Sequence, residues 1–171
     1  MHKLVIVING SGGVGKDTIC NIVGKHYRTM NISSVDPIKK IASENGWDGG
    51  KNEKSRKFLA DLKQLFVDFN DLPCKYLLGK YQEFLESSNE ILFVHIREPE
   101  EISKFKKSVQ KSCITLLIRR TSHTKKEWNN TADDNVEHFN YDFYYDNIKP
   151  YGEIENDFLA FFNSILEKNG S

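Results

Sequence analysis

Residues 4–18 read LVIVINGSGGVGKDT. The first five, residues 4–8, form a continuous apolar run that is mostly β-branched. Such a run is typical of a strand that is buried on both faces of a parallel sheet. A glycine-rich turn follows it, and Ile19, Ile22 and Val23 then recur at helical spacing. The stretch therefore predicts a strand, a glycine loop and a helix in direct succession.

The glycine loop fits the Walker A spacing G-x-x-x-x-G-K, with Gly10 and Gly15 as its glycines and Lys16 as its lysine. Glycines let the backbone curl so that successive N–H groups can point at phosphate oxygens, and the helix that follows adds the positive end of its dipole. A glycine turn that only joins strand to helix is the alternative, and the strand–loop–helix context disfavours it. The residues predicted to bind nucleotide are Gly10, Ser11, Gly12, Gly13, Val14, Gly15, Lys16, Asp17 and Thr18.

The position after the lysine departs from the motif, because Asp17 stands where Ser or Thr is usual and Thr18 follows it. Either Thr18 replaces the usual hydroxyl ligand of Mg²⁺ or Asp17 holds the ion through water. The sequence leaves both open. It predicts ATP and Mg²⁺ as cofactors and gives Lys16 a catalytic role, since its charge would reach the β- and γ-phosphates.

The rest of the chain alternates strands and helices. Further strands are expected at 31–35, 91–96, 114–118 and 141–145. This order predicts a three-layer α/β/α P-loop NTPase fold with a mostly parallel five-stranded sheet, formed by residues 1–171 as a single domain. Two segments are expected to extend from this domain. One is a helical insertion at about 45–88, on the side where the molecule that accepts a phosphate would bind, and the other is a polar, lid-like excursion at about 120–140.

Composition narrows the range of partners. Lys plus Arg equals Asp plus Glu at 24 each, whereas a duplex-binding protein normally carries a basic excess, so we expect no nucleic-acid partner. The three cysteines are widely spaced without a Cys-x-x-Cys, which disfavours disulfides and thiolate zinc and favours a cytoplasmic location. No apolar run is long enough to span a membrane, so we expect no membrane partner.

Charged residues at the expected strand ends are candidates for binding anions, because parallel strands place these ends on one rim. Asp36 is either a helix N-cap before Pro37 or an acceptor ligand. Arg97 follows a buried strand, where it would bind phosphate or pair with Glu98, Glu100 or Glu101. His95, inside that strand, is expected to be a core histidine.

Two stretches, GKDT at residues 15–18 and VDPIKK at residues 35–40, resemble the deoxynucleoside monophosphate kinases of phages and bacteria. In that family an "ADPLK"-like element follows the second strand. The resemblance implies that Arg56 faces the acceptor nucleotide. It also places Arg97 on the arginine of the family's "DVRFPNE" stretch, where His95 replaces an acidic residue that could serve Mg²⁺ or the acceptor.

The resemblance continues toward the end of the chain. Arg119 and Arg120 look like the strand end that opens the lid, and Asp142 and residues 146–147 look like the family's closing segment. It implies a kinase with Lys16, Arg97, Arg119 and Arg120 as catalytic residues. Asp36, Arg56 and Arg97 would bind the substrate.

The expected activity is transfer of the γ-phosphate of ATP to a nucleoside monophosphate, with a deoxynucleotide preferred. Animal-type phosphomevalonate kinases and dephospho-coenzyme A kinases share a related core, so another phosphorylated small metabolite stays open as the acceptor. The alternative outside the enzymes is a regulatory module that binds a nucleotide but has no transfer activity. A GTPase is disfavoured because the chain has no N-K-x-D motif. Oligomeric state and pathway are left open.

Overall fold

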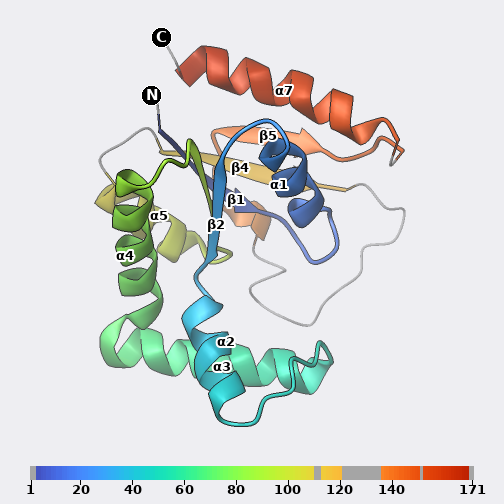
Figure 1. Ribbon diagram of the computed structural model, residues 1–171. Helices are drawn as coiled ribbons and strands as arrows, with labels where there is room; N and C mark the ends of the chain where they lie inside the picture. Colours follow the sequence, from blue (N-terminus) through green and yellow to red (C-terminus); the bar gives the residue numbers. More distant parts are fainter. Residues whose placement is uncertain (1–2, 110–112, 121–135, 151, 170–171) are drawn as a thin grey trace.

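A computed structural model describes residues 3–109, 113–120, 136–150 and 152–169 (Figure 1). Five strands form one sheet in the order β2-β3-β1-β4-β5, and every pairing is parallel. The strands are β1 (Leu4–Asn9), β2 (Thr29–Ser33), β3 (Ile91–His95), β4 (Cys113–Arg119) and β5 (Phe143–Asp146). The predicted five-stranded parallel sheet is confirmed. Most of the predicted lid-like excursion lies outside the described residues.

Six helices and one short 3₁₀ turn make up the rest of the described structure. They are α1 (Lys16–Gly24), α2 (Asp36–Glu44), α3 (Glu53–Asn70), α4 (Leu72–Glu86), α5 (Pro99–Ser108), η1 (Val136–His138) and α7 (Ile154–Asn169). Helices α1 and α7 pack on one face of the sheet, and α4 and α5 pack on the other. Among the described helices, none has the length and apolarity that crossing a membrane requires.

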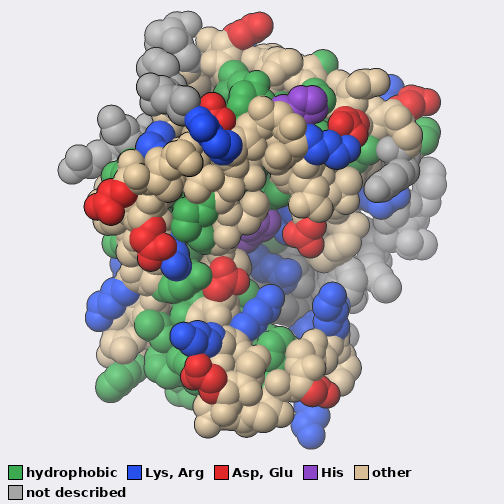
Figure 2. Space-filling view, viewed as in Figure 1, with side chains coloured by type: hydrophobic (Ala, Val, Ile, Leu, Met, Phe, Trp, Pro, Cys, Tyr) green, Lys and Arg blue, Asp and Glu red, His purple; other side chains and the backbone are tan. Residues whose placement is uncertain are grey.

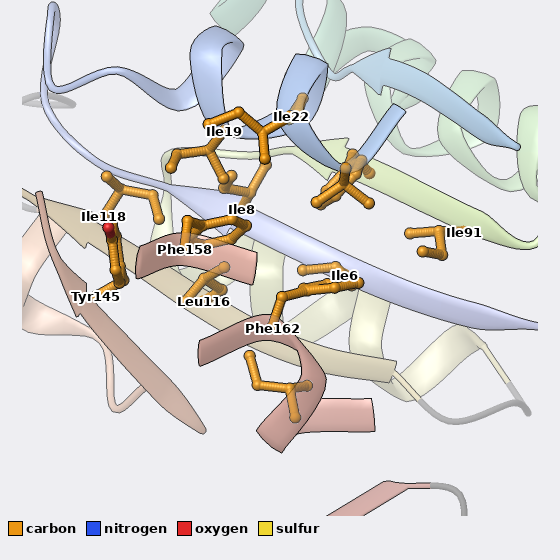
Figure 3. Close-up of a cluster of buried hydrophobic side chains, with 14 of the residues drawn as sticks. Ile6, Ile8, Ile19, Ile22, Ile91, Leu116, Ile118, Tyr145, Phe158 and Phe162 are labelled. Carbon is orange, nitrogen blue, oxygen red and sulfur yellow. The ribbon is translucent and has the colours of Figure 1, made fainter. Parts of the chain in front are cut away.

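The core follows from the alternation of side chains along the central strand. Ile6 and Ile8 of β1 meet α1 and α7, where Phe158 and Phe162 fill the space above the sheet (Figure 3). Val5 and Val7 point to the opposite face and pack against α4 and α5. All six residues of β1 are buried, which is why this strand reads as an unbroken apolar run.

The second and fifth strands differ from the expected ranges. β2 runs from Thr29 to Ser33, two residues earlier at each end than expected. The bond from Ser34 N–H to the carbonyl oxygen of His95 is the last of its pairing with β3, and the chain then turns into α2. α2 begins at Asp36 with Val35 at the N-cap, so the N-cap expected at Asp36 is wrong by one residue. β5 begins two residues later than expected, at Phe143, since Tyr141 turns its side chain into a buried contact with β1.

Helix α3 leaves a line of apolar side chains uncovered. The helical spacing of Phe58, Leu65 and Phe69 is typical of a core face, yet they are 45%, 65% and 81% exposed. The buried residue of α3 is instead Lys63. The physical reason is placement, because α3 packs on α2 and α4 at the edge of the molecule and not on the sheet (Figure 1).

Candidate functional site

The predicted nucleotide-binding loop joins β1 to α1 and needs its glycines. Gly10 has φ 146° and Gly15 has φ 98°, conformations that L side chains rarely adopt. A Cβ atom at Gly10 would also lie 2.4 Å from the carbonyl oxygen of Ile118 in β4. The loop therefore passes directly over the end of β4. α1 begins at Lys16, so the backbone N–H groups of its first turn are available to an anion.

Lys16 folds back over this loop. Its half-buried ammonium group donates to the carbonyl oxygens of Gly10 and Ser11, the latter at 2.9 Å. The loop thus keeps the charge of Lys16 beside its own N–H groups. An anion seated on the loop would meet both kinds of donor at once.

Two buried asparagines that the sequence reasoning did not select hold the loop from either end. Asn9 donates from Nδ2 to the carbonyl oxygen of Arg97 at 3.1 Å and to Tyr141 Oη at 2.7 Å, and its Oδ1 accepts from Gly10 N–H at 2.8 Å. Asn9 therefore ties the start of the loop to the backbone of Arg97. Its position directly after an apolar run is the signal that could have identified it.

Asn147 holds the other end of the loop. Its Nδ2 donates to the carbonyl oxygen of Val14 at 2.8 Å, and its backbone N–H donates to the carbonyl oxygen of Arg119 at 2.7 Å. A Cβ atom at Gly15 would lie 2.6 Å from the same Nδ2. Asn147 is thus a second reason for a glycine at position 15.

His95 marks where the predicted site residues come together. Burial lowers the pKa of its imidazole, and the charges of Asp17, Lys16, Asp36 and Arg97 all act on it. The strand register explains this arrangement, since β3 lies between β1 and β2 and all three end at the same rim. Figure 2 shows Lys or Arg, Asp or Glu and histidine side chains gathered around a hollow between α1 and the layer of α2 and α3. The half-buried imidazole is thus a neighbour of four candidate residues.

Cys20 is the sulfur neighbour of this histidine. Its Sγ lies 3.9 Å from His95 Nε2. Burial, followed by the charge of Asp17, raises the pKa of the thiol to about 12. Cys20 is therefore a packing residue and not a nucleophile at neutral pH.

Asp36 is oriented by two neighbours at the start of α2. Its Oδ2 accepts from Ser33 N–H at 2.7 Å, and Tyr76 of α4 is a neighbour of the same carboxylate. Burial and then the charge of Asp36 raise the pKa of Tyr76. The carboxylate is therefore held in a fixed direction at the rim, where it could accept a hydrogen bond from a hydroxyl group.

A buried ion pair lies near Arg97, one of the two arginines that the sequence assigns to the acceptor. Lys63 of α3 donates to Glu98 at 2.7 Å and to Glu101 at 2.9 Å. Two of the three glutamates considered as partners of Arg97 therefore already hold a lysine. Arg56 lies two turns before Lys63 on the same side of α3, and Arg97 directly precedes Glu98. Arg97 thus lies at the start of α5, beside the ion pair, and Arg56 lies about two helical turns from Lys63 along α3.

Arg119 and Arg120 lie on the other side of the loop, after the Ile118 carbonyl that Gly10 approaches. Arg119 binds both carboxylate oxygens of Asp146, at 2.8 and 3.1 Å, and its guanidinium lies 5.1 Å from the ring centre of Tyr144. Arg120 is exposed just beyond the strand.

Metal ligation would fall on the first turn of α1. The described residues contain no cluster of three or more His, Cys, Asp or Glu side chains that could hold a metal. Asp17 is exposed and Thr18 is half-buried next to the loop. These oxygen ligands fit Mg²⁺, which takes few protein ligands and completes its shell with phosphate oxygens and water.

The lowered pKa of His95 predicts a pH effect on stability. Below about pH 6.5 the unfolded chain protonates this histidine while the folded chain resists, so the free energy of unfolding should fall as pH falls toward 5. His95→Asn should flatten this dependence in urea titrations. His138→Asn, at an exposed histidine, is the matched control and should leave it unchanged. An equal slope in wild type and His95→Asn would contradict the burial of a neutral imidazole.

Comparison with known proteins bears on the fold. No protein-family model matches the chain, and no curated protein sequence matches it. A candidate kinase from Chloroflexus aurantiacus is similar with a TM-score of 0.58 at 12% identity, over 98% of this chain and 97% of that one. A sugar kinase from a Janibacter species is similar with a TM-score of 0.52 at 11% identity, over 95% of each chain.

Shikimate kinase from Aquifex aeolicus is similar with a TM-score of 0.50 at 13% identity, over 94% of this chain and 96% of that one. At sequence identities this low, the structural similarity shows a shared fold and no more. Together with the glycine loop and the parallel sheet, they show a three-layer α/β/α P-loop NTPase fold, as the sequence predicts.

Proposed function

We propose that this protein is a kinase that transfers the γ-phosphate of ATP to a small phosphorylated acceptor, with a nucleoside monophosphate as the first candidate. One observation carries the proposal. The Lys16 ammonium and the first turn of α1 converge on a glycine loop, and Asp36 and Arg97 follow β2 and β3, which end at the same rim as β1. A phosphate seat with an acceptor-side cation and carboxylate beside it suits transfer between two bound molecules.

On the ATP side, the loop N–H groups and Lys16 would bind the β- and γ-phosphates, and Asp17 or Thr18 would hold Mg²⁺. When bound, Mg²⁺ supplies positive charge that neutralises the phosphate oxygens. Asn9 and Asn147 keep the loop in this shape without touching the nucleotide. A cytoplasmic location remains part of the proposal, because the three widely spaced cysteines of the sequence do not form the pattern of a disulfide framework.

On the acceptor side, Arg97 and Arg56 would bind the acceptor's phosphate, and Asp36 would accept a bond from one of its hydroxyl groups. An oxygen of that phosphate attacks the γ-phosphorus while the bond to the bridging oxygen of ADP breaks, and ADP leaves with the electron pair. A phosphate oxygen is largely ionised at neutral pH. The chemistry therefore needs no general base, which is compatible with a neutral His95 at this rim.

The second candidate for the acceptor is a different phosphorylated metabolite. The oriented carboxylate of Asp36 is compatible with this candidate as well. That carboxylate could bind the hydroxyl group of a sugar phosphate as well as that of a nucleotide. The structural neighbours include a sugar kinase and shikimate kinase, which agrees with a small hydroxylated acceptor.

A panel of acceptors separates these readings. ADP formation is followed with ATP·Mg²⁺ and each nucleoside monophosphate, then with sugar phosphates and unphosphorylated sugars. Stimulation by a nucleoside monophosphate supports the first candidate, and stimulation only by another phosphorylated compound supports the second. If only unphosphorylated compounds stimulate, the acceptor's phosphate is excluded. Binding of ATP without stimulation by any acceptor would support a regulatory module instead.

The arginines should separate by kinetic role. Arg97→Ala should raise the acceptor KM at least about tenfold and leave the ATP KM nearly unchanged, because it lies on the acceptor side of the rim. Arg120→Ala should mainly lower kcat, since Arg119 already holds Asp146 and Arg120 is the more available group for charge that develops in transfer. Both are measured by varying each substrate in turn.

Arg28→Ala is the matched control for these variants. Arg28 pairs with Glu90 at 3.5 Å before the start of β2, at the end of the sheet away from the loop. Its loss should leave both KM values and kcat unchanged. Weakened ATP binding with a normal acceptor KM in Arg97→Ala would show that the two sides of the site are assigned in reverse.

A further inference from the structure

The outward face of α3 carries an apolar stripe that no described element covers. Phe58, Leu65 and Phe69 are three of the five large hydrophobic residues that are exposed in the described structure. Their spacings of seven and four residues place them on one line along the helix. Half-buried Leu62 lies beside the same line. Figure 1 shows α3 along the edge of the molecule, so a partner could reach this line over the length of the helix.

The stripe is nearly symmetric about its own middle. Phe58 and Phe69 lie at equal distances from a point between Lys63 and Gln64, and so do Leu62 and Leu65. A surface of this kind can pack against a copy of itself. A two-fold axis through the middle of the stripe would bring Phe58 of one chain opposite Phe69 of the other. Two antiparallel α3 helices would then bury the stripe of both chains.

The charges beside the stripe distinguish this arrangement from others. Lys57 and Asp68 are eleven residues apart, about three helical turns, so they flank the stripe on the same side at opposite ends. In an antiparallel pair Lys57 of one chain would lie near Asp68 of the other. A parallel two-fold pair would instead place the charged flanks of the two chains on opposite sides of the interface, so this contact would not form.

We propose that the protein forms a two-fold dimer through antiparallel packing of α3 on α3. Arg56 and Lys63 lie on the opposite side of the helix, toward α5, so the dimer leaves the candidate site uncovered. A single helix pair is a small interface. The dimer should therefore be reversible and dissociate on dilution.

Sedimentation velocity of the full chain over a wide range of concentrations tests the proposal. Wild type should shift from monomer to dimer as concentration rises. Leu65→Asp should raise the dissociation constant roughly 100-fold, because an interface anchor is worth a factor of about ten and a two-fold dimer contains it twice. Ala60→Asp adds the same charge to an exposed position on the other side of α3 and should leave the dimer intact.

A charge exchange tests the antiparallel register. Lys57→Glu and Asp68→Lys should each weaken the dimer, and the two changes together should restore it. Lys57 also pairs with Asp61 of its own helix at 2.7 Å, but the double variant does not rebuild that contact. Recovery therefore reports on the contact between chains. A wild type that stays monomeric at all concentrations, or a dimer indifferent to Leu65→Asp, would overturn the proposal.

Discussion

Lys16→Ala is expected to abolish nearly all phosphate transfer while leaving the fold intact. The ammonium group lies over the glycine loop, bonded to the Gly10 and Ser11 carbonyl oxygens, where the transferring phosphate would sit. Losing a charge contact that strengthens in the transition state should cost about 3 kcal/mol or more, which is roughly two orders of magnitude in kcat. Steady-state kinetics with a saturating acceptor measures the effect.

Lys25→Ala is the matched control, since it removes a lysine just after the other end of α1. Lys25 forms an exposed ion pair with Glu155, so its loss should alter neither kcat nor the melting temperature. Lys16→Ala must melt like wild type for the result to count. Near-normal turnover in a folded Lys16→Ala protein would remove the lysine from the mechanism.

Lys63→Met should produce the largest loss of stability. The lysine is 8% exposed and binds two glutamates, so removing it leaves Glu98 and Glu101 partly buried without their cation. Breaking a buried ion pair in this way costs about 3–5 kcal/mol in the free energy of unfolding. Lys57→Met removes an exposed lysine from the same helix and should have little effect. Urea denaturation measures both.

Two further observations would identify the ion pair as the cause. Glu98→Gln and Glu101→Gln, added to Lys63→Met, remove the uncompensated charges and should recover part of the loss. Burial opposes ionisation of Glu98, but Lys63 outweighs it and lowers the pKa below the usual 4.5. Its stabilising effect is therefore present above pH 4.5 and lost below, so the loss in Lys63→Met should shrink in acid. A loss that persists unchanged in acid would point to packing alone.

The parts of the fold that follow from local pattern could be predicted from the sequence. An apolar run, a glycine loop and a helical period each lie within a few residues, and β1, its loop and α1 were found there. The parallel order followed because strands that alternate with helices need crossovers. The bounds of β2 were missed by two residues, since they depend on its pairing with β3, which lies about sixty residues further along the chain.

Contacts between distant residues set the limit for the site as well. The Walker spacing identifies Lys16, but nothing near the loop indicates that Asn147 holds Val14 from the far end of the chain. The spacing of Phe58, Leu65 and Phe69 marks an apolar stripe on α3, but spacing alone does not indicate what would cover it. Lys63 interrupts no pattern in the sequence, and its partners Glu98 and Glu101 lie 35 and 38 residues further along the chain.

Direct transfer of labelled phosphate tests the central claim. The protein is mixed with ATP labelled at the γ-position, Mg²⁺ and the acceptor that most stimulates ADP formation, and the products are separated and counted. The kinase account predicts that label moves from ATP to that acceptor in proportion to the ADP formed, and that Lys16→Ala moves almost none. Label released only as free phosphate, or transfer that Lys16→Ala performs as well as wild type, would contradict it.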